Sequence, residues 1–551
     1  MNKINVISLI LASLWVTTIP VFAATNGGDP GAQLRQAWEQ MERATIEREM
    51  EARREESGKT IEDQQEKPVQ QAGLLRFKLE GIRLDESAVL PKEKRDEFAA
   101  EWLGREVSVE DLYKIVRKIN DWYRENGYIT CRAYLPAQTI HKGVVHIVLI
   151  EGRTGEIKIS GNVHTRPEYI RSRMDMATGN IENMRTLDKN ISRFNATNDV
   201  ALHLTIRAGK EKGTTDYELT VREPQNSVTT LYFDGAGNES TGRWRSGVFY
   251  SNHSLSGFRD SLNLGYLHAR GLESFSSGYS FPISRKGTRL GIDYSTNATK
   301  VVDGLYRQWN METKGHASSV GLSLRHPIRA NSSGRTEVSL AVSRQHSVTD
   351  VTTIRMVDDT FTEGSASVAF LHYAGRKALY HRYSFIWGNW NNDSFAVNGS
   401  TDKSYGFLTI NSVYQQGAAA GQLFTARANA QWGGGQRLSA SKQFYLGGAY
   451  SVRGYKENAI GAESGFSLNL EYAVPVRKDR ALSLYGFFDV GSLWGSSSPQ
   501  HHTLAGTGLG LRARAGNTVA LDMALAFPLR RTLDFEETGK SRVHLNAMVS
   551  F

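Results

Sequence analysis

After Pro224 the chain becomes a succession of short segments in which apolar and polar residues alternate, such as SLNLGYLHA, RLGIDYSTN and VALDMALAF. Successive side chains of a strand point to opposite faces, so about ten alternating residues suit a strand with one face in lipid and the other in a wet lumen. We count about sixteen such segments, an even number within the range of bacterial single-chain barrels. This repeated alternation constrains the fold more strongly than any other feature of the sequence. It predicts a membrane β-barrel of sixteen antiparallel strands over residues 224–551.

The connections between these segments fall into two alternating sets. One set is short, as in PISRKG, AGRK and RAGN, and the other contains longer stretches such as WNNDSFAVNGSTDK and RRTLDFEETGK. Short periplasmic turns and long external loops are typical of outer-membrane barrels. The longest connection, at about 434–464, is then the sixth external loop, and the chain ends on an inward-running strand that closes with Phe551. A soluble array of β-sandwiches is the alternative, but it would require no such alternation of loop lengths.

The amino terminus resembles a secretory signal peptide over residues 1–23. Lys3 precedes an apolar run that ends at a small-residue cleavage site, Val21 to Ala23. A retained membrane anchor is the alternative, but the run is short for that purpose. Beyond it no uninterrupted apolar stretch reaches ~20 residues, so we expect no transmembrane helix. A single cysteine, Cys131, excludes an internal disulfide, and we expect it to fill a buried position.

The overall composition also favours a barrel. The formal charge of +9 is spread over interleaved basic and acidic residues, so it does not indicate a nucleic-acid partner. The chain contains 52 glycines and 22 each of tyrosine and phenylalanine. Such a composition suits an outer-membrane barrel better than a soluble enzyme.

Residues 24–57 predict a helix that starts at Asp29 and Pro30 and is polar around most of its circumference. Such a helix has no ordinary hydrophobic core to join, so it is either solvated or lodged in a wet, polar space. Residues 58–73 are rich in glutamine and predict a flexible linker.

Two small α/β units follow, over residues 74–153 and 154–223. Each predicts the order strand, helix, helix, strand, strand, which identifies an internal repeat. In the first unit Ser108 is a candidate N-cap, with Asp111 three residues later and Gly127 as the helix stop.

Motifs of enzymes are missing from the sequence. It contains no Gly-x-Ser-x-Gly nucleophile elbow, no His-Glu-x-x-His and no phosphate-binding loop that ends in Lys-Ser or Lys-Thr. His501 and His502 are adjacent but have no carboxylate or cysteine nearby in sequence, so they make a poor metal site. We therefore expect no catalytic residues, no metal and no cofactor.

Two short stretches stand out in the barrel region. The sixth external loop contains Val452, Arg453, Gly454 and Tyr455, and a later strand contains Phe487, Asp489 and Gly491, which share one face by alternation. If that face points to the lumen, Asp489 is an inward carboxylate on the wall. An ordinary lumen-facing aspartate in a wet pore would give the same alternation, and the pattern leaves both interpretations open.

With these motifs in this order, the whole mature chain resembles the outer-membrane transporters of two-partner secretion systems, the filamentous-haemagglutinin and haemolysin secretion family. These transporters belong to the larger group of POTRA-bearing barrels that includes the barrel-assembly insertase. The resemblance rests on the architecture, on the motifs Val452–Tyr455 and Phe487–Gly491, and on NGYITCRAYLPAQ in the first unit. It implies that residues 24–57 plug the lumen and that residues 74–153 and 154–223 are POTRA domains.

The resemblance further implies a non-enzymatic outer-membrane translocator with its POTRA domains in the periplasm. Its expected partners are an exoprotein with a two-partner secretion domain, outer-membrane lipid and the barrel-assembly machinery, and we expect a monomer. A general barrel insertase is the alternative function, and a passive porin would leave the POTRA pair without a role. Phe551 is expected to be the insertion signal. We also expect the sixth loop to fold into the lumen, where Gly447, Gly448 and Gly454 allow close approach to the wall and Arg453 meets Asp489.

Overall fold

The computed structural model describes residues 46–47, 50, 76–304, 307, 310–392, 402–477, 479–500, 502–516, 518–533 and 536–551. They divide into two compact units. One contains the described residues of Thr60–Glu223, and the other contains Pro224–Phe551 together with Ile46, Glu47 and Met50. The expected signal peptide and linker lie outside the described residues.

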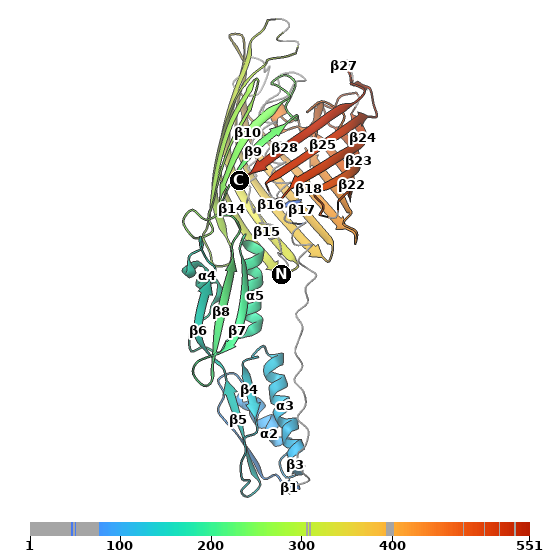
Figure 1. The fold of residues 1–551 in the computed structure, drawn as a ribbon. Helices are drawn as coiled ribbons and strands as arrows, with labels where there is room; N and C mark the ends of the chain where they lie inside the picture. The colour runs from blue at the N-terminus through green and yellow to red at the C-terminus, as the bar shows by residue number, and fades with distance from the viewer. Residues whose placement is uncertain are drawn as a thin grey trace. The chain divides into compact units, whose positions relative to one another are not determined.

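The first α/β domain packs two helices against a small sheet (Figure 1). Its longer helix, α3 (Val109–Glu125), begins with a capping box between Ser108 and Asp111, and the apolar residues on one of its faces are buried in the domain core. Thus the 3.6-residue period of the sequence decides which face of the helix is covered. The other elements are β1 (Arg76–Lys78), β2 (Gly81–Leu84), α2 (Lys92–Ala100), β3 (Glu106–Ser108), β4 (Cys131–Tyr134) and β5 (Val144–Glu151).

The second α/β domain repeats this order of elements. It consists of β6 (Arg153–Ser160), α4 (Pro167–Met174), α5 (Met184–Thr197), β7 (Ala201–Ala208) and β8 (Thr214–Arg222). Pro167 opens α4, and the side chain of Asn183 caps α5. The two main sheets have equivalent strand orders, β2-β5-β4 and β6-β8-β7, each with one parallel and one antiparallel pair. The internal repeat predicted from the sequence is therefore a structural repeat.

The remainder forms a closed antiparallel barrel of sixteen strands, which confirms the predicted fold class. Its strands, in order along the chain, are β9 (Ser227–Asp234), β10 (Arg245–Asn252), β11 (Ser261–Ala269), β12 (Leu272–Pro282), β13 (Arg289–Lys300), β14 (Thr313–Asn331), β15 (Gly334–Val351), β16 (Ile354–Ala374), β17 (Lys377–Asn392), β18 (Asp402–Gly417), β19 (Leu423–Trp432), β22 (Ser464–Pro475), β23 (Leu482–Trp494), β24 (Thr503–Ala515), β25 (Val519–Pro528) and β28 (Arg542–Ser550). The two-residue strands β26 (Thr532–Leu533) and β27 (Glu536–Glu537) pair with each other between β25 and β28.

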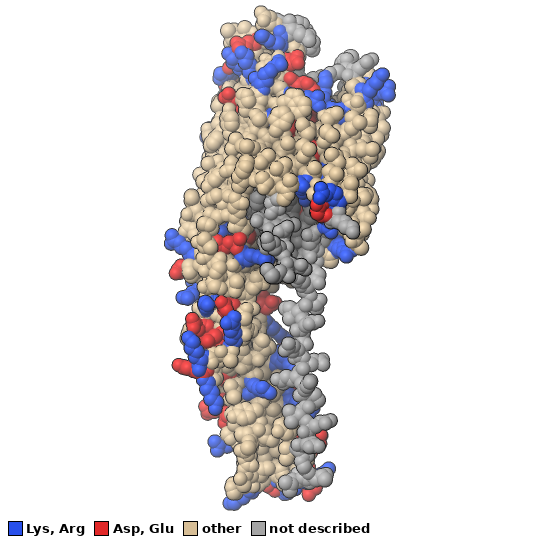
Figure 2. All heavy atoms as spheres, viewed as in Figure 1, with Lys and Arg blue, Asp and Glu red and all other residues tan. Residues whose placement is uncertain are grey.

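Alternation sorts the barrel side chains between its two faces. On β13, Leu290, Ile292 and Tyr294 are exposed on the outer face, whereas Asp293 and Ser295 are buried toward the lumen. Figure 2 shows a broad band on the visible outer wall of the barrel that has few charged residues. An apolar outer band of this kind is suited to lipid.

The barrel closes where the last strand, β28, pairs with the first, β9 (Figure 1). This seam has only five paired positions, Asn546–Ser550 with Thr230–Asp234. Phe551 lies just past β28, and its backbone extends the seam by exchanging hydrogen bonds of 2.9 and 3.1 Å with Thr229.

Among the described residues, no helix is both long enough and apolar enough to cross a membrane. Of the expected helix at 24–57 the structure describes three residues, Ile46, Glu47 and Met50, all helical, and the rest lies outside the described residues. Met50 is fully buried in an apolar cluster with barrel residues, among them Leu371 and Tyr380. Ile46 and Met50 therefore pack against the inner wall of the barrel.

Candidate functional site

The candidate site lies where the longest connection meets the barrel wall. Between β19 and β22 the chain forms a short 3-10 helix, η1 (Ala440–Lys442), and then two paired strands, β20 (Phe444–Leu446) and β21 (Ile460–Ala462). The glycine-rich tip, 447–459, spans the gap between β20 and β21 and has no strand of its own. We call the whole connection, 433–463, the sixth loop.

At the tip, Arg453 binds the carboxylate of Asp489 on β23 in a bidentate arrangement. Its Nε donates to Oδ2 at 2.7 Å and its Nη2 donates to Oδ1 at 2.8 Å, while the backbone N–H of Arg453 donates to Oδ2 at 3.1 Å. Asp489 is 0% exposed and Arg453 is 8% exposed. The structure thus brings together the two charged residues that the sequence singles out, and it orients Asp489 toward the lumen.

The neighbouring side chains fix the two partners of this pair. Asn469 on β22 donates to Asp489 at 2.9 Å and also bonds the carbonyl of Ser451 in the loop. The ring of Phe487 lies under the guanidinium, with 3.5 Å between the ring centroid and the Cζ atom of Arg453. Phe487 and Asp489 of the barrel wall therefore both bind the Arg453 guanidinium, because the aromatic face stabilises the same cation that the carboxylate pairs with.

The other motif residues hold the loop close to the wall. Val452 and Tyr455 are almost completely buried, and the hydroxyl of Tyr455 donates to the carbonyl of Ala505 at 3.0 Å. A Cβ atom at Gly454 would lie 2.8 Å from the backbone nitrogen of Pro528, and one at Gly491 would lie 2.6 Å from Leu446 of the loop. Both positions therefore require glycine for contact between loop and wall.

The expectation for the other two loop glycines is wrong. Gly447 and Gly448 both have positive φ, but the nearest atoms that a Cβ would meet there belong to Lys456, Glu457 and Ala459 of the same loop, not to the wall. They allow the tip to turn back on itself. The close approach on the wall side instead uses Gly506 of β24, where a Cβ would lie 2.1 Å from the carbonyl oxygen of Arg453.

A larger charge network surrounds the pair, and the sequence reasoning missed it. Glu471 on β22 lies 3.6 Å from Arg453, 3.5 Å from Arg427 and 3.0 Å from Arg512. Arg512 in turn binds Asp522 at 2.8 Å. Glu471, Arg427, Arg512 and Asp522 stand on lumen-facing positions of four strands. Alternation could therefore have placed each of them in the lumen but not beside the others.

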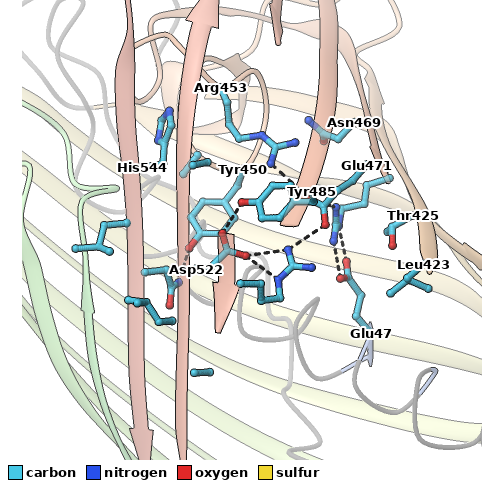
Figure 3. A pocket seen from close by; sticks show the side chains of 18 of the residues that line it. Glu47, Leu423, Thr425, Tyr450, Arg453, Asn469, Glu471, Tyr485, Asp522 and His544 are labelled. Carbon is cyan, nitrogen blue, oxygen red and sulfur yellow. Dashed lines mark hydrogen bonds and ion pairs between the residues drawn. The ribbon is translucent and has the colours of Figure 1, made fainter. Parts of the chain in front are cut away.

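The network reaches the amino-terminal helix. Glu47 binds Arg427 through two hydrogen bonds of 2.5 and 2.7 Å. Figure 3 shows Glu47 and Glu471 around the pocket that Arg453 of the loop also lines. This pocket has a volume of about 230 Å3 and is lined by residues of the helix, the loop and the wall. One connected set of charges therefore links three parts of the barrel unit.

Two more buried ion pairs lie elsewhere in the barrel. Lys442 at the base of the loop binds Glu363 of β16 at 2.6 Å, and both side chains are at most 3% exposed. Arg245 of β10 binds Asp234 of β9 at 2.5 Å, with both side chains fully buried. Among the described residues, no group of histidine, cysteine, aspartate or glutamate could hold a metal ion. The charged groups around the contact of Arg453 with Asp489 are paired with one another, which suits a structural latch.

Comparison with known proteins gives two family matches. Residues 213–513 match the model of the haemolysin secretion/activation protein ShlB/FhaC/HecB, and residues 77–152 match the model of the ShlB-type POTRA domain. Among curated proteins, the heme/hemopexin transporter protein HuxB of Haemophilus influenzae (strain 86-028NP) is 25% identical over 460 residues, which cover 79% of this chain and 80% of HuxB. The outer membrane transporter CdiB of Escherichia coli is 24% identical over 463 residues, covering 77% of this chain and 76% of CdiB.

Solved structures with the same fold include two barrels of this kind. CdiB from Escherichia coli superposes with a TM-score of 0.71 at 20% identity, over 96% of this chain and all of that one. BamA from Haemophilus ducreyi lacking POTRA domains 1–3 gives a TM-score of 0.53 at 13% identity, over 86% of this chain and all of that one. At these identities the similarity concerns the fold alone.

Proposed function

Because the chain belongs to the haemolysin secretion/activation family, we propose that it is the outer-membrane transporter of a two-partner secretion system. It recognises an exoprotein in the periplasm through its POTRA domains and secretes it through its own barrel. The observation that carries this proposal is the match of the family model to residues 213–513, together with a ShlB-type POTRA match at residues 77–152 of the same chain. The barrel resides in the outer membrane, and the POTRA domains face the periplasm.

The residues of the two motifs would act as a latch for the sixth loop. Arg453 and Asp489 form a bidentate ion pair that is almost fully removed from solvent. Because each partner leaves an uncompensated charge when the other departs, the pair favours one seated position of the loop. We propose that Val452, Gly454 and Tyr455 fit the tip to the wall, and that Phe487 and Gly491 shape the surface on which it sits.

The amino-terminal helix would close the lumen at rest. The ion pair of Glu47 with Arg427 and the burial of Met50 against the wall support this proposal. We propose that residues 24–57 form the plug and leave the lumen when an exoprotein passes. The three described residues of this segment already contact both a charged and an apolar part of the wall.

The remaining proposals concern partners and chemistry. We propose that the protein is monomeric and has no enzymatic activity, and that outer-membrane lipid surrounds its apolar band. The barrel-assembly machinery would insert it, with Phe551 as part of the insertion signal.

Deletion of the gene tests the proposed function. We expect the deletion strain to lose a large exoprotein from its culture medium and to regain it when the intact chain is supplied from a plasmid. The abundance of unrelated outer-membrane barrels should stay at the wild-type value. A general fall in those barrels, with all exoproteins still secreted, would instead identify an insertase.

A further inference from the structure

A second pocket of the barrel lies between the first part of the sixth loop and strands β16, β17 and β18. It has a volume of about 420 Å3, within the range of about 300–1,000 Å3 that is usual for pockets that bind small groups. The residues that matter below are Phe361, Trp390, Lys403 and Tyr405 on the wall and Arg437 and Lys442 on the loop. We call this cavity the mouth pocket.

The mouth pocket lies at the external end of the lumen. The POTRA domains face the periplasm and lead directly into β9, so the antiparallel order makes the chain run outward on β17 and inward on β18. Trp390 is two residues from the end of β17, and Lys403 is the second residue of β18. By alternation Trp390 stands on the same face as Ile386 and Asn392, which are buried toward the lumen. A chain that leaves through the lumen would therefore meet this pocket near its exit.

Stacked aromatic rings form the floor of the pocket. The rings of Phe361 and Trp390 are almost parallel, at an angle of 14°, with their centroids 6.1 Å apart. Tyr405 meets Phe361 edge-on, at 82° and 6.2 Å. Both arrangements are favoured by the charge distribution of aromatic rings. Phe361 is completely buried and Trp390 is half-buried, so Trp390 is the ring that remains available to a ligand.

The buried ion pair of Lys442 with Glu363 supports this floor. The Lys442 Nζ atom lies 4.5 Å from the centroid of the Phe361 ring. Glu363 accepts from Lys442 at 2.6 Å and from the hydroxyl of Tyr405 at 2.7 Å. One carboxylate thus fixes both the cation beside Phe361 and the ring that packs against it. The pair therefore holds the aromatic floor in place before any ligand arrives.

The charge that faces the mouth pocket is positive. Lys403 and Arg437 are both exposed, and the Nζ atom of Lys403 lies 5.6 Å from the ring centroid of Trp390. Neither cation forms an ion pair with another described residue, and no described carboxylate lines the pocket. Glu363 is already bound to Lys442, and Asp359 on the same strand accepts from Asn392. The open cations therefore favour an acidic ligand.

We propose that the mouth pocket binds an aromatic side chain of the exoprotein as it leaves the lumen, with an acidic residue of the same segment beside Lys403 and Arg437. This inference rests on the proposed function and adds to it a contact site at the exit. A glycolipid of the outer leaflet could offer similar chemistry, but it lies outside the wall, whereas Trp390 stands on the lumenal face. A single aromatic contact holds the emerging segment briefly and opposes its return.

Photo-crosslinking in the full-length chain tests the contact. A tagged exoprotein with a two-partner secretion domain is stalled in transit by a fused disulfide-bonded domain that cannot cross. A crosslinking residue at position 437, where the side chain is exposed, should capture the stalled exoprotein. The same residue at Asp303, an exposed position in the external connection between β13 and β14, should capture little.

Substitutions in the pocket test the chemistry of the contact. Trp390→Ala should lower the capture at position 437 about fivefold, the factor that corresponds to an aromatic contact of about 1 kcal/mol. Trp390→Phe keeps an aromatic face and should capture as the wild type does. Trp387→Ala, on the outer face of the same strand, is the matched control and should leave the capture unchanged. Lys403→Glu should lower the capture, whereas Lys403→Arg should preserve it.

Mass spectrometry of the captured segment identifies the ligand. We expect an aromatic residue with aspartate or glutamate within a few positions, and heat-modifiability shows that each variant barrel has folded. Equal capture at 303 and 437, undiminished capture by a folded Trp390→Ala variant, or capture of a glycolipid in place of the exoprotein would each overturn the mouth pocket as an exit site. If the wild-type chain fails to secrete the unfused exoprotein, it is the proposed function that fails.

Discussion

At the scale of single residues, the pairing of Arg453 with Asp489 determines how the sixth loop is held. The carboxylate is completely buried and accepts from the guanidinium, from the backbone of Arg453 and from Asn469. Removing one partner of a buried ion pair costs about 3–5 kcal/mol, whereas an exposed pair contributes only about 0–1 kcal/mol. The full strand ladder of the barrel is independent of this pair, so the loss would affect the seating of the loop.

We therefore expect Arg453→Ala and Asp489→Ala each to leave a heat-modifiable barrel in the membrane but to impair secretion strongly. The double variant should secrete little less than either single variant, because it lacks the unpaired buried charge that each single variant leaves behind. Secretion into the medium and heat-modifiability in isolated outer membranes are the measurements.

A matched control for this cycle is the exposed pair of Arg477 and Asp479, at 2.9 Å with side chains 65% and 52% exposed. Arg477→Ala is expected to secrete normally, because an exposed pair adds little. If both single variants at 453 and 489 secreted normally, the latch would be a different contact. The same would follow if the secretion defect of the double variant equalled the product of the two single defects.

Cys131 gives a prediction about pH. Burial, with a smaller contribution from Glu151, raises the pKa of the Cys131 thiol to about 11. Because the thiolate is the reactive form, the folded protein should remain unlabelled by maleimide at pH 7 to 8 and become reactive only as the pH approaches 11. Mass spectrometry of the native and urea-unfolded chain measures this difference. Rapid labelling of the native chain at pH 7 would contradict it.

At the scale of elements, the seam between β28 and β9 has the fewest paired positions of the adjacent strand pairs that the structure describes in the barrel. β28 shares five paired positions with β9, and Phe551 adds two backbone hydrogen bonds with Thr229. The Phe551 side chain itself is 62% exposed. This residue thus contributes its backbone to the seam, while its ring stays available on the surface.

Removal of Phe551 should lower the amount of protein in the outer membrane, because it deletes the last hydrogen bonds of the seam and the proposed insertion signal together. Phe551→Tyr keeps the backbone and the aromatic ring, and should assemble as the wild type does. Quantitative immunoblots of isolated outer membranes compare the two variants. Wild-type abundance after removal would exclude Phe551 as a signal.

At the scale of the whole molecule, the barrel unit is linked internally by one charge network. Glu47 of the helix binds Arg427, Arg427 lies 3.5 Å from Glu471, and Glu471 lies 3.6 Å from Arg453 of the loop. Displacing the helix would remove one carboxylate from this set and leave the cations with fewer partners. Helix and loop therefore bias each other's position through shared charges.

Deletion of residues 29–57 should raise the single-channel conductance in planar bilayers while the barrel still assembles, because the proposed plug would be missing from the lumen. Glu47→Gln keeps the helix but weakens its ion pair, so it should increase the frequency of opening without the full rise in conductance. An unchanged conductance after the deletion would rule out the plug.

The sequence by itself determined the elements of this protein. Alternation of period two and the alternating loop lengths predict sixteen membrane strands, and the repeated strand and helix order predicts two small α/β domains. These signals are local, because a strand or an amphipathic helix is specified by neighbours a few residues apart. The Arg453 and Asp489 motifs were also visible, although alternation left open whether Asp489 faced a partner.

Only the tertiary structure decided which distant residues meet. Glu471, Arg512 and Asp522 stand on different strands, and their contact depends on strand register, which a period-two pattern does not fix. Gly506 became the wall glycine beside Arg453 because the loop returns across β24, a path that the loop sequence does not specify. In the same way, Asn120 and Asn195 look like ordinary helix residues until the fold places each against the edge of a sheet.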